Sequence, residues 1–351
     1  MSDPVGVPWP AQTATGVGSM PGTDQAEAIA VVLGELPNLP HLPELPARGP
    51  GADMVGRTAA LLVDMPVETT ARGWRLAERP GRDMRRAAGL LSADLDAMEA
   101  AAGGYSGVFK IQLCGPWTLA ASLELARSVE PALGDPGAVA DLTASLAEAA
   151  AAHVAAVRRR LPDATILVQF DEPALPGVIE GSVPTASGLR RVPAVEESVA
   201  ADGLAAVVAA TSAPTMLHCC APRLPFGCLT RSGATAVSFD LALLRREDEN
   251  AIGEVAESGL GIAIGAVPAV ETARSGGAQA MTAERAARDI AGSVVGLWNR
   301  IGLLADALTG QVAVTPACGL AGASPAWARD ALTRCQAAAN LIPELIEEGA
   351  P

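Results

Sequence analysis

The amino-acid sequence predicts an α/β protein built as a single (β/α)8 barrel of the TIM type. Short β-like runs alternate with longer Ala- and Leu-rich segments, and eight such runs recur along the 351 residues. A strand followed by a helix, repeated, indicates a parallel sheet covered by helices. A closed barrel typically takes about 250 residues, so the chain is long enough for eight repeats with some long insertions.

The eight predicted strands are short and largely apolar, as expected for parallel strands that are buried on both faces. The second of them is the weakest. They are Thr13–Met20, Leu42–Leu45, Val108–Leu113, Thr165–Phe170, Thr215–His218, Ala234–Phe239, Gly261–Ala266 and Val312–Val314.

Segments long enough for crossover helices lie between most of these runs. Examples are Asp24–Leu36, Asp83–Ala102, Pro136–Leu161, Val195–Ala210, Thr282–Ala305 and Ala326–Glu348. Pro- and Gly-rich patches at 37–51 and 173–184 predict loops beyond strand ends. No linker divides the chain, so we expect residues 1–351 to form one domain, with 1–12 as an N-terminal extension.

A doubly wound open sheet is the alternative architecture. Such a fold carries a glycine-rich phosphate-binding turn after its first strand. The sequence Gly16-Val17-Gly18-Ser19-Met20-Pro21 lies at that point, but it lacks the third glycine and Pro21 interrupts the turn. The barrel is therefore the favoured prediction.

Composition and charge exclude several functional classes. The formal net charge is −14, which repels phosphate backbones and anionic membrane surfaces, so neither nucleic acid nor a membrane is an expected partner. The mean hydropathy is +0.28, yet apolar stretches such as Gly259–Val270 are shorter than the roughly 20 residues of a spanning helix. The N-terminus has no secretion signal, and the six cysteines are scattered. We therefore expect a cytoplasmic protein whose Cys and His residues serve metal binding or catalysis.

Polar and metal-binding residue types occur where the predicted strands end. In a (β/α)8 barrel the active site lies at the C-terminal ends of the strands. Only the seventh predicted strand, which ends at Ala266, has no polar residue there. The residues at the other ends are Ser19, Glu44, Gly115-Pro116-Trp117, Asp171-Glu172, His218-Cys219-Cys220, Asp240 and Cys318.

His218, Cys220 and Cys318 predict a zinc site. Zinc favours thiolate and imidazole ligands in a tetrahedron. Residues two apart in a strand point to the same face, so His218 and Cys220 can reach one metal while Cys219 points away. The barrel returns its last strand towards its middle ones, which brings in Cys318, and Asp240 can add an oxygen ligand. A buried Cys is more often a small apolar residue, and we interpret Cys114, Cys228 and Cys335 in that way.

Five motifs resemble, in the same order, stretches of cobalamin-independent methionine synthase, and above all its short single-barrel relatives. The resemblance extends from about Thr13 to about Ala326. The motifs are Gly18-Ser19-Met20-Pro21, Gly115-Pro116-Trp117-Thr118, Asp171-Glu172-Pro173-Ala174-Leu175, His218-Cys219-Cys220 and Pro316-Ala317-Cys318-Gly319-Leu320.

In that family a barrel holds zinc with one His, two Cys and one Glu. The zinc takes the thiol of homocysteine, and a methyl group moves from a folate to the sulfur. The resemblance implies that His218, Cys220 and Cys318 are ligands and that Asp171 meets the substrate amino group. It also implies that Ser19 and Glu44 help to hold the amino acid, and it assigns Trp117 to the substrate site.

The sequence departs from the family pattern at two strand ends. Asp240 stands where the family has a Glu ligand, so a shorter carboxylate must reach the metal or act through water. The seventh strand end reads Gly265-Ala266-Val267-Pro268-Ala269-Val270, where the family has Asp-x-His-Ser-Pro with a His that handles a proton on the methyl donor. Thiol activation is therefore better supported than folate as the donor.

The sequence thus predicts zinc-dependent methyl transfer to homocysteine or a similar small thiol. A free thiol has a pKa of about 8.5, and zinc binding would convert it to a thiolate at neutral pH. The donor could be a folate, a corrinoid or another methyl carrier. The alternatives are a non-catalytic zinc- or thiol-binding relative and a metal-free lyase of the uroporphyrinogen decarboxylase type, which would need a basic pocket.

Overall fold

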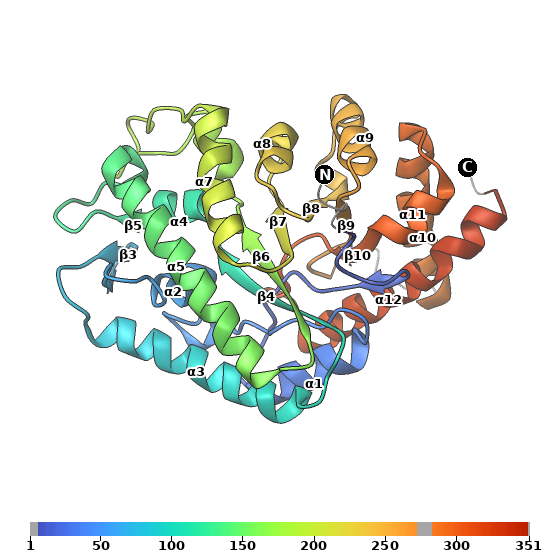
Figure 1. Cartoon of the computed structure of the whole chain (residues 1–351), viewed down its shortest axis with the longest axis horizontal. Helices are drawn as coiled ribbons and strands as arrows, with labels where there is room; N and C mark the ends of the chain where they lie inside the picture. Colours follow the sequence, from blue (N-terminus) through green and yellow to red (C-terminus); the bar gives the residue numbers. More distant parts are fainter. Residues whose placement is uncertain (1–5, 272–282, 350–351) are drawn as a thin grey trace.

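The computed structural model describes residues 6–271 and 283–349. Its main sheet is curled, and its seven parallel strands follow the order β1-β10-β9-β8-β7-β6-β4. Helices surround the strands (Figure 1), so the predicted α/β class is confirmed. The strands are β1 (Thr13–Ala14), β4 (Val108–Cys114), β6 (Thr165–Asp171), β7 (Thr215–Cys219), β8 (Ala236–Asp240), β9 (Gly261–Val267) and β10 (Val312–Pro316).

The eighth position of the barrel is taken by an extended segment instead of a regular strand. Leu42 N donates to Lys110 O (2.9 Å) on one side, and Glu44 N donates to Gly18 O (3.1 Å) on the other. The parallel bridges His41–Lys110 and Ser19–Glu44 thereby join the two edges of the sheet. The expected strands Thr13–Met20 and Leu42–Leu45 were wrong in extent. Prolines at 40, 43 and 46 lack the N–H that a continuous ladder requires.

The helices lie close to the predicted segments. Asp24, Asp135 and Ser324 accept hydrogen bonds from backbone N–H groups of the first turn that they cap. No helix among the described residues is long and apolar enough to span a bilayer. The α-helices are α1 (Gln25–Glu35), α2 (Met54–Ala59), α3 (Arg82–Ala102), α4 (Pro116–Ser122), α5 (Pro136–Arg160), α6 (Leu175–Ile179), α7 (Glu197–Ala210), α8 (Phe226–Arg231), α9 (Glu249–Glu257), α10 (Ala283–Ile301), α11 (Ala305–Gln311) and α12 (Pro325–Glu347).

Two features differ from the sequence prediction. The expected helix Thr282–Ala305 begins outside the described residues, and its visible part ends at Ile301 because Gly302 adopts a left-handed φ of 74° before α11 starts. A small second sheet was not predicted. It consists of the hairpin β2 (Val67–Thr70) and β3 (Gly73–Leu76), with β5 (Leu123–Glu124) parallel to β3.

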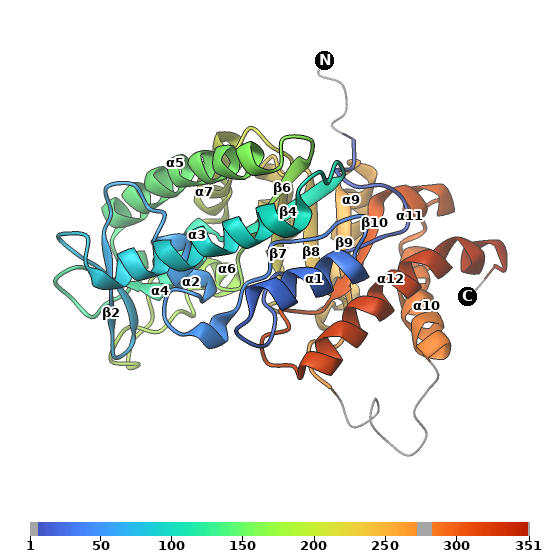
Figure 2. The same ribbon diagram turned by 90° about the horizontal axis from the view of Figure 1, so that it is seen from below.

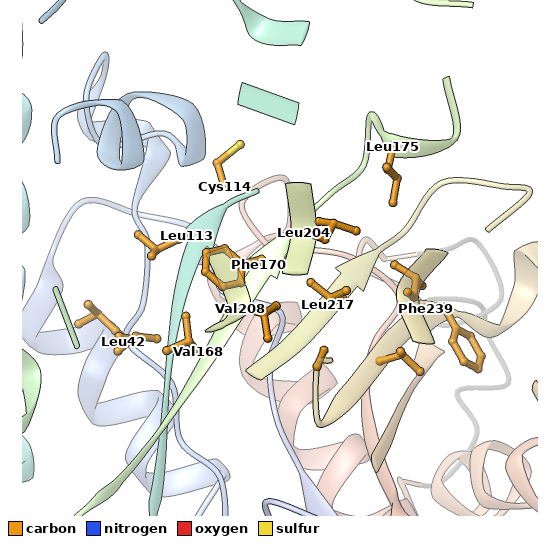
Figure 3. Close-up of a cluster of buried hydrophobic side chains, with 14 of the residues drawn as sticks. Leu42, Leu113, Cys114, Val168, Phe170, Leu175, Leu204, Val208, Leu217 and Phe239 are labelled. Carbon is orange, nitrogen blue, oxygen red and sulfur yellow. The ribbon is translucent and has the colours of Figure 1, made fainter. Parts of the chain in front are cut away.

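The alternation of side chains along each strand separates an apolar outer layer from a more polar interior. Phe170 on β6 and Leu217 on β7 belong to the same cluster as Leu204 and Val208 of α7 (Figure 3). The opposite face of β6 carries Leu167 and then, two residues further along, Gln169. Leu167 belongs to a second, smaller apolar cluster. Seen from below, α1 and α12 lie side by side over the strands (Figure 2). The functional groups therefore have to come from the inward positions and the strand ends.

The N-terminal end of the barrel is filled by a small apolar cluster. Trp9, within the segment expected to be an extension, is only 5% exposed. A Cβ at Gly261 would lie 2.7 Å from the Trp9 ring, so the indole packs directly on the first residue of β9. The cluster comprises Trp9, Leu39, Leu167, Met216, Ala236, Ala263 and Ala313.

We expect Trp9→Ala to destabilise the protein by about 3–5 kcal/mol, because a large buried ring is replaced by a cavity. Urea denaturation followed by circular dichroism measures this change. Leu189→Ala is the control, since Leu189 is 90% exposed and its truncation should alter stability by less than about 0.5 kcal/mol. Equal stabilities of the two variants would contradict the packing role of Trp9.

Candidate functional site

Six of the eight predicted site residues line one cavity of about 260 Å³ at the C-terminal ends of the strands; we call it the acceptor cavity. Asp240 and Trp117 are outside it. The lining residues are Val17, Gly18, Ser19, Glu44, Pro46, Met54, Asp171, Pro173, His218, Cys220, Cys318 and Gly319.

His218 presents a free ring nitrogen to this region. Its Nδ1 lies 2.9 Å from Ser238 Oγ, on the neighbouring strand β8. Its Nε2 is buried and has no hydrogen-bond partner among the residues that the structure describes. If Nδ1 carries the proton and donates to Ser238, the Nε2 lone pair is available, which is the usual arrangement of a histidine that binds metal.

The two predicted cysteine ligands meet although they are far apart in sequence. Cys220 Sγ and Cys318 Sγ are 3.1 Å apart. Pairing with Cys220, and then the nearby His218 ring, lowers the pKa of Cys318 to about 4, whereas the same pairing raises the pKa of Cys220. The contact therefore favours a thiolate on Cys318 next to a thiol on Cys220. Cys219 points away as expected, and burial raises its pKa to about 12.

The loop that carries Cys318 packs tightly on the loop that carries Ser19. Leu320 N donates to Ser19 O (2.8 Å), and a Cβ at Gly319 would lie 2.1 Å from Ser19 Oγ. A side chain at position 319 would displace this hydroxyl. The first and last strands of the barrel thereby deliver a hydroxyl and a thiol to the same wall of the acceptor cavity.

Asp171 is held by a buried chain of hydrogen bonds from inward-facing side chains. Gln169 Nε2 donates to Asp171 Oδ1 (2.7 Å), and Lys110 Nζ donates to Gln169 Oε1 (2.7 Å). Lys110 Nζ also donates to Val17 O (2.8 Å). Burial raises the pKa of Asp171 and lowers that of Lys110, and each of the two charges opposes the shift of the other. The chain fixes the direction of the Gln169 amide and hence the position of the carboxylate.

Glu44 is anchored by charges from α2 and α3. Arg57 Nε on α2 lies 3.6 Å from Glu44 Oε1, and the Arg57 guanidinium also pairs with Asp94 on α3. Asp94 in turn accepts two hydrogen bonds from Arg48 (2.7 and 2.8 Å). Burial is the main cause of a raised pKa for Glu44, and Arg57 opposes it.

Glu172 serves the backbone instead of the acceptor cavity. Its carboxylate accepts hydrogen bonds from Trp117 N (2.9 Å), Thr118 N (2.8 Å) and Thr118 Oγ1 (2.7 Å), which anchors the first turn of α4. A Cβ at Gly115 would lie 2.3 Å from Glu172 Oε1, so the Gly-Pro-Trp-Thr motif forms the seat of this carboxylate.

Trp117 does not meet the substrate cavity, which corrects its predicted assignment. Its Nε1 donates to Ala200 O (2.9 Å) on α7, and the ring packs against Gly203. The reason is that Glu172 holds the backbone of the turn, so the indole points outward between the barrel and α7. The motif was correctly located, but the direction of its side chain was not.

Asp240 lies at the edge of the site. Its Oδ1 accepts a hydrogen bond from Ala242 N (2.8 Å) and caps the short turn that follows β8. Burial raises the pKa of Asp240. The charge of Cys318 raises this pKa further, and that of His218 lowers it. Among the described residues, no group of three or more His, Cys, Asp or Glu side chains is arranged to hold a metal ion as it stands.

Lys110, Gln169, Arg57 and Ser238 were not singled out from the sequence. Lys110 and Gln169 occupy inward positions of strands that are otherwise apolar, and that unusual polarity was the available signal. Arg57 lies on a six-residue helix with no recognisable pattern. Ser238 follows from the strand register, which only the structure provides.

A parallel α/β barrel with imidazole, thiol and carboxylate groups at the C-terminal ends of its strands has the architecture of a barrel enzyme. Residues 11–341 match the family model described as cobalamin-independent synthase, catalytic domain, and the chain belongs to that family. Membership identifies it as a methionine synthase-type catalytic domain and is consistent with methyl transfer to homocysteine.

Among solved structures, the chain is similar to a B12-independent methionine synthase from Shewanella sp. W3-18-1 in complex with selenomethionine. The TM-score is 0.61 at 12% identity, and the match covers 96% of this chain and 99% of that one. A carboxyl transferase domain of Rhizobium etli pyruvate carboxylase matches with a TM-score of only 0.26 at 12% identity, over 73% of this chain and 49% of that one. A search of curated proteins found no match.

We expect Glu172 to make stability depend on pH. Burial raises its pKa to about 7, above the unfolded value of about 4.5, so the folded state retains a proton that the unfolded state has lost. This contribution is complete below about pH 4.5 and is lost as the pH rises through 7, a change of up to about 3 kcal/mol. Denaturant titrations of the wild type and Glu172→Gln at pH 5 and pH 8 measure it. A wild-type advantage that does not shrink between pH 5 and pH 8 would sink this expectation.

Proposed function

We propose that the protein transfers a methyl group to the thiol of homocysteine with the help of a zinc ion held by His218, Cys220 and Cys318. The observation that carries this proposal is the buried, partnerless His218 Nε2 beside two sulfurs that are 3.1 Å apart. These groups share one cavity with the carboxylates of Asp171 and Glu44. The cavity therefore combines a metal-binding end with an end that suits an ammonium group.

The chemistry of these donors fits zinc. One imidazole nitrogen and two thiolates are preferred zinc ligands, and bound zinc would lower the pKa of a substrate thiol so that it reacts as a thiolate. In a tetrahedral site with Zn–S of about 2.3 Å, the two sulfurs would be roughly 3.7 Å apart. The Cys220 and Cys318 side chains therefore have to separate by a few tenths of an ångström. Ser238 would keep the His218 ring oriented.

Asp240 is our proposed fourth protein ligand. Its Oδ1 is already bonded to Ala242 N, so Oδ2 is the oxygen that can turn towards the metal. Because this carboxylate is shorter than the Glu of the family pattern, we expect it to be the weakest of the four ligands. A weak ligand is readily displaced, which leaves a position for the substrate sulfur.

The opposite end of the acceptor cavity suits an amino acid. Asp171 and Glu44 offer buried negative charge to an ammonium group, and Ser19 adds a hydroxyl. Lys110 and Gln169 hold Asp171 in place, so little reorganisation is needed when substrate binds. A volume of about 260 Å³ suits a small thiol such as homocysteine. A folate and a corrinoid carrier are the candidate methyl donors to be tested.

The charge of the cavity disfavours the lyase alternative. A decarboxylase of acidic porphyrin precursors needs basic side chains around its substrate, whereas the residues that line the acceptor cavity include two carboxylates and neither Lys nor Arg. The non-catalytic alternative differs only in the reaction, and methyl transfer from any donor to homocysteine excludes it.

We expect the zinc-loaded protein to hold about one zinc per chain, because there is a single ligand cluster. Cys220→Ser and Cys318→Ser should each lose most of it, and Ser238→Ala should weaken binding about 10–100-fold by freeing the His218 ring. Mass spectrometry of the metal content after dialysis against a graded chelator measures both effects. Cys228→Ala is the matched control, since Cys228 is a buried thiol outside the cavity. Full retention of zinc by both serine variants would refute the site.

We expect Asp171→Asn to weaken homocysteine binding by about 2–5 kcal/mol, because the ammonium group loses its buried counter-charge while the shape is kept. Calorimetric titration of the zinc-loaded protein gives the Kd. Asp96→Asn, on the outer face of α3, is the control. An unchanged Kd for the Asp171 variant would show that this carboxylate does not meet the substrate amino group.

A further inference from the structure

A second cavity, which we call the donor cavity, adjoins the acceptor cavity. Its volume is about 510 Å³, within the range of about 300–1,000 Å³ that is usual for small-molecule sites. The ends of β8, β9 and β10 form its walls, and Cys318 lines both cavities. The lining residues are Asp240, Leu241, Ala242, Gly265, Ala266, Val267, Pro268, Ala269, Ala317 and Cys318.

The walls of the donor cavity are fixed by close backbone contacts. A Cβ at Gly265 would lie 2.8 Å from both Phe239 O and Ala317 Cα, so this glycine lets three strand ends converge. Ala317 N donates to Val267 O (2.8 Å), next to a register shift between β9 and β10. Trp327 Nε1 donates to Pro268 O (3.2 Å) from α12. The cavity is therefore a feature of the barrel itself.

The lining of the donor cavity has a simple chemistry. Among the described residues that line it, Asp240 is the one charged side chain, Cys318 contributes a thiol, and the other side chains are apolar or absent. None of these lining residues is a His, Lys, Arg, Ser, Thr or Tyr. A carboxylate among apolar walls attracts a weakly hydrated cation, because a buried charge is costly unless it is paired.

Cys318 lies at the boundary of the two cavities, so molecules bound in both could meet there. A substrate sulfur bound next to Cys318 in the acceptor cavity would lie at the boundary with the donor cavity. A methyl group presented from that side would be within reach of the sulfur. A donor with an amine leaving group requires a general acid to protonate the nitrogen. A donor that leaves as a neutral group requires none, so it matches a lining whose described residues are mostly apolar, whether or not Asp240 is bound to the metal.

We propose that the donor cavity binds the methyl donor and that this donor is a small methylsulfonium, an inference that rests on the proposed function. The cation faces Asp240, and its carbon substituents contact the apolar walls. The substrate thiol loses its proton to solvent when it binds. Its thiolate sulfur then attacks the methyl carbon and forms a new S–C bond. The electrons of the breaking C–S bond return to the donor sulfur, which leaves as a neutral thioether, and no proton or oxidant takes part in the transfer.

The test uses the full chain loaded with zinc, 15N-labelled homocysteine, and S-methylmethionine that carries trideuterated methyl groups on its sulfonium. Mass spectrometry then counts methionine that carries both the 15N label and a trideuterated methyl group, which separates the product of homocysteine from the methionine that the donor leaves behind. We expect transfer from this sulfonium to be at least tenfold faster than from 5-methyltetrahydrofolate or methylcobalamin in parallel reactions. Faster transfer from either of those two donors overturns the assignment of the donor class.

Two substitutions test the location. Ala242→Phe, at an exposed position, and Ala266→Phe each place a ring in the donor cavity and should lower the transfer rate at least tenfold, with homocysteine affinity unchanged by calorimetry. Ala71→Phe makes the same change at an exposed turn and should leave the rate unaltered. Full rates in both cavity variants overturn the location.

Homocysteine binding separates this inference from the proposed function. If the wild type binds homocysteine but no sulfonium methyl is transferred, the donor assignment is overturned and the thiol site stands. If the zinc-loaded protein does not bind homocysteine, the proposed function fails and the donor assignment fails with it.

Discussion

The alternation of side chains along the parallel strands is the constraint on which the rest of the structure depends. Outward positions such as Phe170 and Leu217 pack against helices, so the inward positions are the only ones that face a common centre. Near the N-terminal end those inward residues are apolar, and Trp9 packs among them. Near the C-terminal end they are polar, and they continue into the loops that hold the thiols. The barrel thus has a packed end and a reactive end.

Buried charge at the reactive end has to be balanced, because a buried ion is costly unless it is paired. Lys110 inside the barrel and Arg57 in the outer layer supply the positive charges that stabilise Asp171 and Glu44. Neither cation lines the acceptor cavity, so Asp171 and Glu44 are the acidic groups that face it. On our proposal, this division lets two buried carboxylates face the ammonium group of the substrate. It also makes Lys110 and Gln169 positioning residues for the proposed substrate contact.

Cys318 connects the family membership with the features that are particular to this chain. Family membership identifies a methionine synthase-type catalytic domain, and the acceptor cavity contains the groups that such a reaction needs on the thiol side. On the donor side, the end of β9 is apolar, and the sequence resemblance implies a histidine there in the family. On our proposal, this change at one strand end alters the leaving group and leaves the thiol chemistry intact.

The sequence by itself determined the parallel barrel class, six of the strands to within two residues, and the strand-end origin of four residues that line the acceptor cavity, namely Asp171, His218, Cys220 and Cys318. These features depend on local hydrophobic patterning and on where each run stops, which a sequence displays directly. The tertiary structure decided the rest. It closed the barrel through a proline-interrupted segment, turned Trp117 outward and supplied Lys110, Arg57 and Ser238 as partners. These outcomes depend on register and on contacts between distant segments, and no local pattern encodes them.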